Sequence, residues 1–116
     1  MAMLWFPTRK SISALMSDGE ICASGRATIT LERVKGRVCF RLDWSGIGTP
    51  VAAHIHEGPD GPCVLPLFVD RPKRQGCVKA PTSLLRKISE SPGRYYLTLR
   101  TQSSPSGALR GQLGTG

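Results

Sequence analysis

The chain has 116 residues, of which 40% are hydrophobic, so it is long enough for one compact domain and too short for two separate cores. Its apolar runs stay far below the ~20 residues that a transmembrane helix needs, so we expect no membrane segment and no membrane partner. The formal net charge is +8, but the basic residues are scattered and only 6% of residues are aromatic. This pattern disfavours a nucleic-acid-binding surface and favours another anionic partner.

The N-terminal segment MAMLWFPTRK has its apolar residues before its basic pair, the reverse of the order in a secretory signal peptide. We therefore expect the protein to be cytoplasmic. We also expect one domain at residues 10–116, with residues 1–9 as an N-terminal extension. A secreted or periplasmic location is the alternative if a signal peptide has been removed.

From residue 24 onward the hydrophobic pattern has a period of two, which predicts antiparallel β-strands. Alternating segments on both sides of Lys35 and Gly36 predict a hairpin with a two-residue turn. Its register pairs Val34 with Arg37. The remaining pairs of this register join apolar residues: Leu31 with Phe40, Ile29 with Leu42 and Ala27 with Trp44.

The rest of the chain continues this β pattern with one interruption. Pro81 and polar residues precede an apolar side formed by Leu84, Leu85 and Ile88, which predicts a helix at 81–88 that covers an edge or an end of the sheet. We predict an all-β antiparallel fold, a β-sandwich or a flattened barrel, with this one short helix. Further strands are expected at residues 51–56, 64–69, 94–101 and 108–113, with weaker patterns at 11–15 and 77–79.

Strand alternation also predicts one polar face built from three segments. His54 and His56 alternate with Ala53 and Ile55, so both imidazoles are expected to point away from the core. If the three strands are neighbours, this face is rich in hydrogen-bond donors and has Glu57 at its rim. The same parity in the two later strands adds these outward side chains: Tyr96, Thr98, Arg100, Arg110 and Gln112.

Three uses of this face are chemically reasonable. In the first, Arg100 and Arg110 hold an anionic or polar group of a small molecule, a glycan or a protein, and Tyr96, Thr98 and Gln112 add ligand contacts. In the second, the protein is an intracellular cyclase or isomerase in which His54 or His56 is the catalytic base and Glu57 the acid or orienting group. In the third, the histidines form structural hydrogen bonds that position the loop after Glu57, and the domain is an interaction module without a pocket.

The two histidines are a weak basis for a metal site. Side chains two residues apart on a strand can reach one metal, but a third ligand would have to be Glu57, a cysteine or water, because the chain has only two histidines. The arginines oppose a bound cation. We therefore expect no metal and no cofactor. The following segment, Glu57 to Pro62, is expected to be a tight turn with Gly58 and Gly61 available for positive φ.

The residues then match a known family. The segments SGRATITL (24–31), AHIHEGP (53–59), VLPL (64–67) and GALRGQL (107–113) resemble the CHRD domain, the module repeated in chordin and found alone in many bacterial proteins. The resemblance implies an immunoglobulin-like or superoxide-dismutase-like β-sandwich. HIHEG is also similar to the histidine strand of copper-zinc superoxide dismutases, but a dismutase centre needs more histidines than this chain has, so we do not expect dismutase activity.

The resemblance bears on the cysteines and on one strand. The four cysteines include no CxxC pair, which disfavours a zinc knuckle. Relatives imply that Cys39 and Cys77 form a disulfide, while Cys22 and Cys63 form a second bridge or remain thiols. Family members typically carry Asn and His where this chain has Thr98 and Arg100. At the second position, a permanently charged guanidinium that can hold an anion thus stands in place of an imidazole.

Overall fold

The computed structural model describes residues 8–17, 23–104 and 107–114. One strand, β1 (Arg9–Ser17), begins inside the N-terminal extension expected at residues 1–9, and residues 1–7 lie outside those described. The remaining elements follow in the order β2 (Ser24–Glu32), β3 (Arg37–Ser45), β4 (Pro50–Glu57), β5 (Cys63–Val69), β6 (Gln75–Lys79), α1 (Thr82–Glu90), a 3₁₀ turn η1 (Pro92–Arg94), β7 (Tyr95–Thr101) and β8 (Leu109–Gln112).

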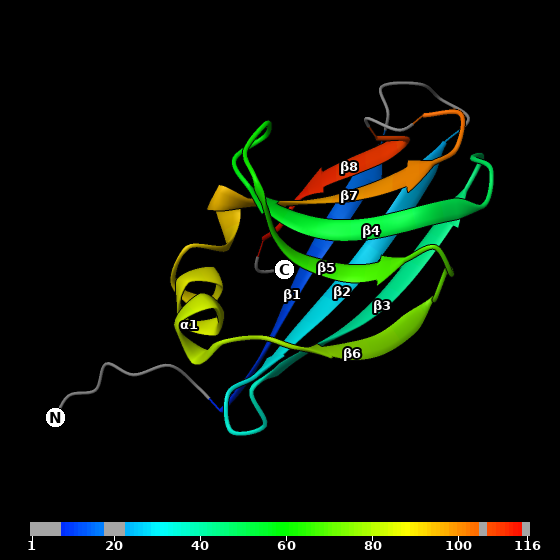
Figure 1. Ribbon diagram of the computed structural model, residues 1–116. Helices are drawn as coiled ribbons and strands as arrows, with labels where there is room; N and C mark the ends of the chain where they lie inside the picture. Colours follow the sequence, from blue (N-terminus) through cyan, green and yellow to red (C-terminus); the bar gives the residue numbers. More distant parts are fainter. Residues whose placement is uncertain (1–7, 18–22, 105–106, 115–116) are drawn as a thin grey trace, which may run out of the picture.

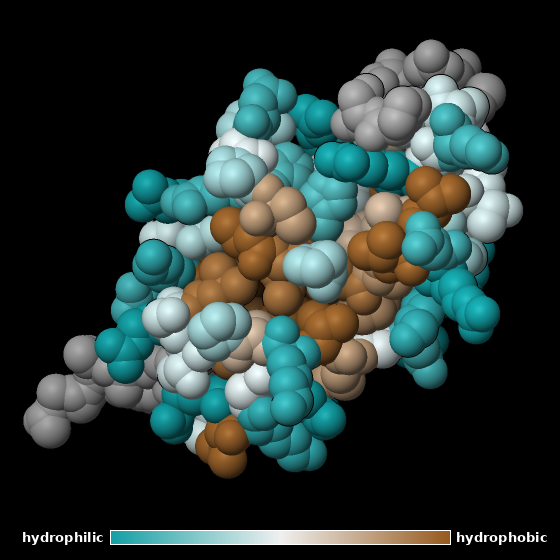
Figure 2. Space-filling view, in the orientation of Figure 1, coloured by the Kyte–Doolittle hydropathy of each residue, from teal (hydrophilic) through white to brown (hydrophobic). Residues whose placement is uncertain are grey.

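The strands form a single antiparallel sheet in the order β5-β4-β7-β8-β1-β2-β3-β6, curled into a nearly closed barrel (Figure 1). The prediction of an all-β antiparallel fold with one short helix is confirmed. β5 and β6 are the two edges of the sheet, and apolar side chains gather where these edges approach one another (Figure 2). The inward residues of the strands fill the barrel; Ile29, Leu42, Ile55, Leu97 and Leu99 are among its fully buried side chains.

The register of the β2–β3 hairpin differs from the prediction by two residues. Arg37 pairs with Glu32 rather than Val34, and the turn comprises residues 33–36. A two-residue turn of the favoured hairpin type needs positive φ at both central positions. Gly36 has a φ of 64°, whereas Lys35 does not adopt positive φ. Because a shift of two residues retains the face of every side chain, the predicted inward residues still face the core.

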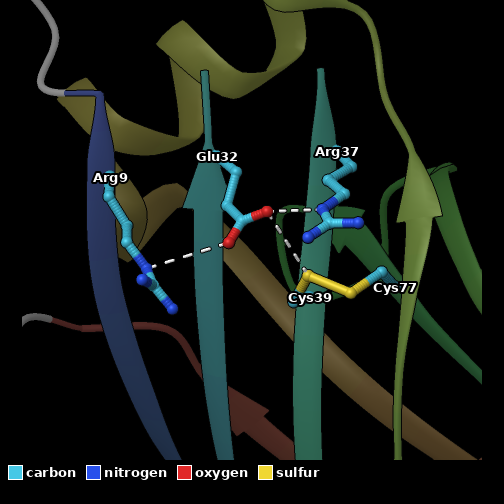
Figure 3. Close-up of a disulfide and its surroundings, with 5 residues drawn as sticks. All are labelled: Arg9, Glu32, Arg37, Cys39 and Cys77. Atoms are coloured by element: carbon cyan, nitrogen blue, oxygen red, sulfur yellow. Dashed lines mark hydrogen bonds and ion pairs between the residues drawn. A yellow bond between two sulfur atoms is a disulfide. The ribbon is translucent and has the colours of Figure 1, made fainter. Parts of the chain in front are cut away.

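A disulfide joins β3 to the edge strand β6. Cys39 and Cys77 are directly opposite one another in the register, and their sulfur atoms are bonded, as the family resemblance implied (Figure 3). Beside the disulfide, the Glu32 carboxylate accepts a hydrogen bond from Arg37 Nε, which lowers the pKa of this carboxyl. Cys63 is an exposed free thiol, and Cys22 lies outside the described residues.

Helix α1 covers one end of the barrel, close to the start of β1 (Figure 1). Its Leu85 and Ile88 are fully buried, and Lys10 Nζ of β1 donates a hydrogen bond of 2.7 Å to the Ser89 carbonyl. The helix begins one residue later and ends two residues later than predicted. Within the described ranges, no helix combines the length and apolar character needed to span a membrane.

Candidate functional site

The strands that carry the predicted polar face are neighbours. β4 pairs with β7, and β7 pairs with β8, while β5 pairs with the other side of β4. Side chains directly opposite one another share a face of the sheet, so the register arranges the site in rows. One row runs through Cys63, His56, Tyr96 and Gln112, and the next through Pro66, His54, Thr98 and Arg110. Arg100 lies one step farther along, opposite Ala52 of β4.

A cavity of about 280 Å³ lies over this face. The structure brings together five residues of the predicted site at its wall: His54, His56, Thr98, Arg100 and Arg110. Four lining residues were not in the predicted site: Pro59, Asp60, Gly61 and Cys63. They come from the loop between β4 and β5 and from the first position of β5, and this loop stands next to the end of β8 (Figure 1).

His56 is held at both ring nitrogens. Its Nδ1 lies 2.9 Å from the Gly58 carbonyl oxygen, which can only accept, so Nδ1 carries the proton. Its Nε2 lies 2.6 Å from Thr98 Oγ1. Burial lowers the pKa of His56 and outweighs the Gly58 hydrogen bond, which raises it. The neutral ring therefore accepts a hydrogen bond from the Thr98 hydroxyl at Nε2, and His56 connects the loop to β7 as the structural interpretation expected.

His54 is different, because it is buried without a hydrogen-bond partner. Its side chain is 9% exposed, and neither ring nitrogen is hydrogen-bonded to another residue in the described part of the chain. The ring centroid lies 5.8 Å from that of His56. Burial lowers the pKa of His54, and the charges of Arg100 and His56 lower it further. A neutral imidazole with one donor and one acceptor thus faces the cavity.

The two arginines have different roles in the geometry. Arg110 is held by the loop: its Nη1 donates to the Pro59 carbonyl at 3.2 Å and lies 3.6 Å from Asp60 Oδ1. Arg100 is exposed and forms neither an ion pair nor a hydrogen bond with any residue that the structure describes. Its guanidinium group is therefore available to a ligand that enters the cavity.

Two glycines allow the loop to fold back over the histidines. Gly58 has a φ of 77°, as predicted. Gly61 does not adopt the positive φ that is available to glycine, and a different constraint applies there. A Cβ atom at position 61 would lie 1.6 Å from the Glu57 carbonyl oxygen, so this close approach requires glycine. The resulting turn places Pro59 and Asp60 against Arg110.

The remaining predicted residues lie beside the cavity. The Glu57 carboxylate does not line it and instead lies 3.6 Å from Arg94 Nη2. Gln112 Nε2 donates to the Gly93 carbonyl at 2.6 Å. Tyr96 stacks near His56, with ring centroids 6.1 Å apart, and it lines a second hollow of about 460 Å³ together with Arg110 and Gln112. The predicted face is thus divided into two hollows that share Arg110.

This arrangement restricts the chemistry that the site can perform. Both nitrogens of His56 are hydrogen-bonded and Glu57 is paired with Arg94, so proton transfer would depend on His54. In the described ranges, no three His, Cys, Asp or Glu side chains are grouped closely enough to hold a metal ion. What the cavity offers is a free guanidinium and a neutral imidazole. Together these groups suit the recognition of an anionic group.

Comparisons with known proteins agree with the sequence resemblance. The family model for the CHRD domain matches residues 12–113, from β1 to the residue after β8. No curated protein and no solved structure matches the chain significantly. The local similarity of HIHEG to superoxide dismutases stays a prediction.

Proposed function

The chain belongs to the CHRD domain family, and we propose that it is a ligand-binding domain whose cavity at His54, Thr98 and Arg100 receives an anionic group. The ligand is a small molecule, or a side group of a glycan or protein, that carries a carboxylate or a similar oxyanion. A volume of about 280 Å³ suits one such group.

One observation carries the proposal: Arg100 and His54 line the same cavity, and neither makes a hydrogen bond within the described part of the chain. The ring nitrogens of His54 are not among the buried, unpartnered polar atoms of the described residues, so they keep contact with solvent and can hydrogen-bond to a ligand in its place. An exposed guanidinium beside this ring supplies a charge and a planar fork of donors that fits an oxyanion. An anion in the cavity would have both groups in the surrounding wall.

The surrounding groups fit this use. Arg110 adds a second positive charge, partly balanced by Asp60. Because the Thr98 hydroxyl donates its hydrogen bond to His56, its oxygen is left as an acceptor for a hydroxyl or N–H group of the ligand. The lining therefore favours an anion that also bears a hydrogen-bond donor.

The test is a titration of the isotope-labelled protein with acetate, lactate, succinate, phosphate and sulfate at low ionic strength, followed by NMR. We expect saturable shifts of the His54 and Thr98 signals, and an affinity about five- to tenfold weaker in Arg100→Gln, because an oxyanion loses a charged bidentate partner. Arg41→Gln removes the same charge from the exposed face of β3 and is expected to bind like the unmodified protein. Unaltered affinity in Arg100→Gln, or no binding of any of these anions, would overturn the proposal.

A further inference from the structure

The cavity contains a thiol that the anion-binding proposal does not use. Cys63 is the first residue of β5 and pairs with His56 just after a register shift in the β4–β5 ladder, and the cavity lining includes both residues. Cys63 is exposed to solvent and is not part of the disulfide. A reagent that enters the cavity can therefore reach this sulfur.

A second observation indicates that this cavity takes a ligand. The imidazole of His54, nine-tenths buried and without a hydrogen-bond partner among the described residues, lines the same cavity as the thiol. The charged lining groups are two arginines, Arg100 and Arg110, and one carboxylate, Asp60. The cavity around Cys63 is therefore net positive, which favours an anionic reagent over a neutral or cationic one.

We propose that Cys63 is a site of covalent modification for small disulfides that carry carboxylates, held at the anion-binding cavity while the thiol reacts. The inference rests on the proposed function, because Arg100 is the group that holds the carboxylate. It goes further in assigning the cavity a thiol–disulfide exchange reaction and a class of reagent.

The exchange is balanced without any other oxidant. The Cys63 thiol loses its proton to solvent, and the thiolate attacks one sulfur of the reagent. A new S–S bond forms to Cys63 while the S–S bond of the reagent breaks. The departing sulfur takes the electron pair and a proton from water, and it leaves as a carboxylate-bearing thiol. The Cys63 sulfur is oxidised, and one sulfur of the reagent is reduced.

The experiment compares reaction rates with three disulfides of different charge in a Cys22→Ser background. The probes are 5,5′-dithiobis(2-nitrobenzoate), which is anionic, 2,2′-dipyridyl disulfide, which is neutral, and cystamine, which is cationic. A short cysteine peptide supplies the intrinsic rate ratios. We expect the folded protein to prefer the anionic reagent over the neutral one by about three- to tenfold more than the peptide does, and the preference to shrink with added salt.

Matched variants show whether Arg100 causes the preference for the anionic reagent. Arg100→Gln is expected to lower the rate with the anionic reagent by about three- to tenfold and to leave the neutral reagent unaffected, while Arg41→Gln changes neither rate. Cys63→Ser should abolish the reaction. Peptide mass mapping of the unmodified chain, treated with limiting reagent, should place the adduct on Cys63, which keeps the inference testable if Cys22→Ser does not fold.

Three results would overturn the inference: peptide-like rate ratios, an Arg100→Gln variant with an unchanged preference, or an adduct on another cysteine. Measuring anion binding to the Cys63→Ser variant distinguishes a failure of the proposed modification from a failure of the proposed anion binding. If that variant binds acetate or phosphate through Arg100 while the thiol shows no charge preference, only the modification is wrong. If it binds neither anion, the proposed function fails as well.

Discussion

The Nε2 atom of His56 lies 2.6 Å from the hydroxyl oxygen of Thr98, a residue that is 42 positions later in the chain and stands on the neighbouring strand. This bond crosses from β4 to β7 beneath the cavity. The opposite nitrogen of the same ring holds the Gly58 carbonyl of the loop. A single side chain thus connects two strands and the loop that follows β4.

Replacing Thr98 should test the energetic weight of this connection. Thr98→Val retains the shape of the side chain but leaves the buried His56 Nε2 without a donor, so we expect the free energy of unfolding to fall by about 1–2 kcal/mol. Thr98→Ser keeps the hydroxyl and should lose less. Thr28→Val, at an exposed position of β2, is the control and should change little. Urea denaturation measures all three; equal stability of Thr98→Val and the unmodified protein would contradict this role.

The two histidines should make the protein sensitive to acid. Burial lowers both pKa values below the ordinary value of 6.5, so in the range below 6.5 the unfolded chain binds protons that the folded protein does not. The free energy of unfolding is therefore expected to fall as the pH drops from about 6.5 through the folded-state pKa values. NMR titration of the two imidazoles should show midpoints below 6.5. Midpoints at or above this value would show that the rings are not desolvated.

Arg100 should influence the titration of His54 through its charge. Burial is the largest cause of the lowered pKa of His54, and the positive charge of Arg100 is the next. We therefore expect Arg100→Gln to raise the pKa of His54, whereas Arg41→Gln should leave it unchanged. The same NMR titration measures the shift. If the two variants titrate alike, Arg100 does not project its charge into the cavity.

The disulfide should contribute to stability as a link between the edge strand β6 and the rest of the sheet. It closes a loop across a sequence separation of 38 residues, and constraining such a loop in the unfolded chain is worth about 3–4 kcal/mol. We expect the Cys39→Ser/Cys77→Ser double variant to lose about this much free energy of unfolding, and Cys63→Ser to lose little. Urea denaturation of the oxidised proteins measures both losses. A double variant as stable as the unmodified protein would show that β6 is held by its other contacts.

Much of the polar face could be predicted because strand parity determines which side each residue occupies. His54, Thr98 and Arg110 each alternate with buried apolar neighbours, and the sheet order places their strands side by side. Parity does not say what covers a face. Parity predicted only that both imidazoles point away from the core. His54 and His56 are in fact almost fully buried, and residues of the loop and of β5 line the same cavity.

The site residues that the prediction missed make contacts with residues far away in the sequence. Local sequence patterns carry no information about such contacts. Asp60 reaches Arg110 only because the loop folds back, and Cys63 joins the site only through its pairing with His56. The hairpin register was missed for a related reason: the apolar pattern is satisfied equally well by two registers that differ by two residues. The conformation of Lys35 decides between them, and that depends on the whole turn.

The close approach of Gly61 to Glu57 provides a final test of how the loop shapes the site. Gly61→Ala would place a Cβ atom 1.6 Å from the Glu57 carbonyl oxygen, so the backbone must move, and we expect a loss of about 1–3 kcal/mol in the free energy of unfolding. The displaced loop should also release Arg110 from Pro59 and weaken anion binding.

Gly48→Ala is the matched control for this change, because a Cβ atom there meets nothing within 4 Å and the residue has no positive φ. Urea denaturation and the phosphate or acetate titration measure the two effects separately. If Gly61→Ala loses stability but binds the anions normally, the loop does not shape the binding site, and the ligand is held by the strands alone. If both variants behave alike, the tight turn between β4 and β5 does not exist in solution.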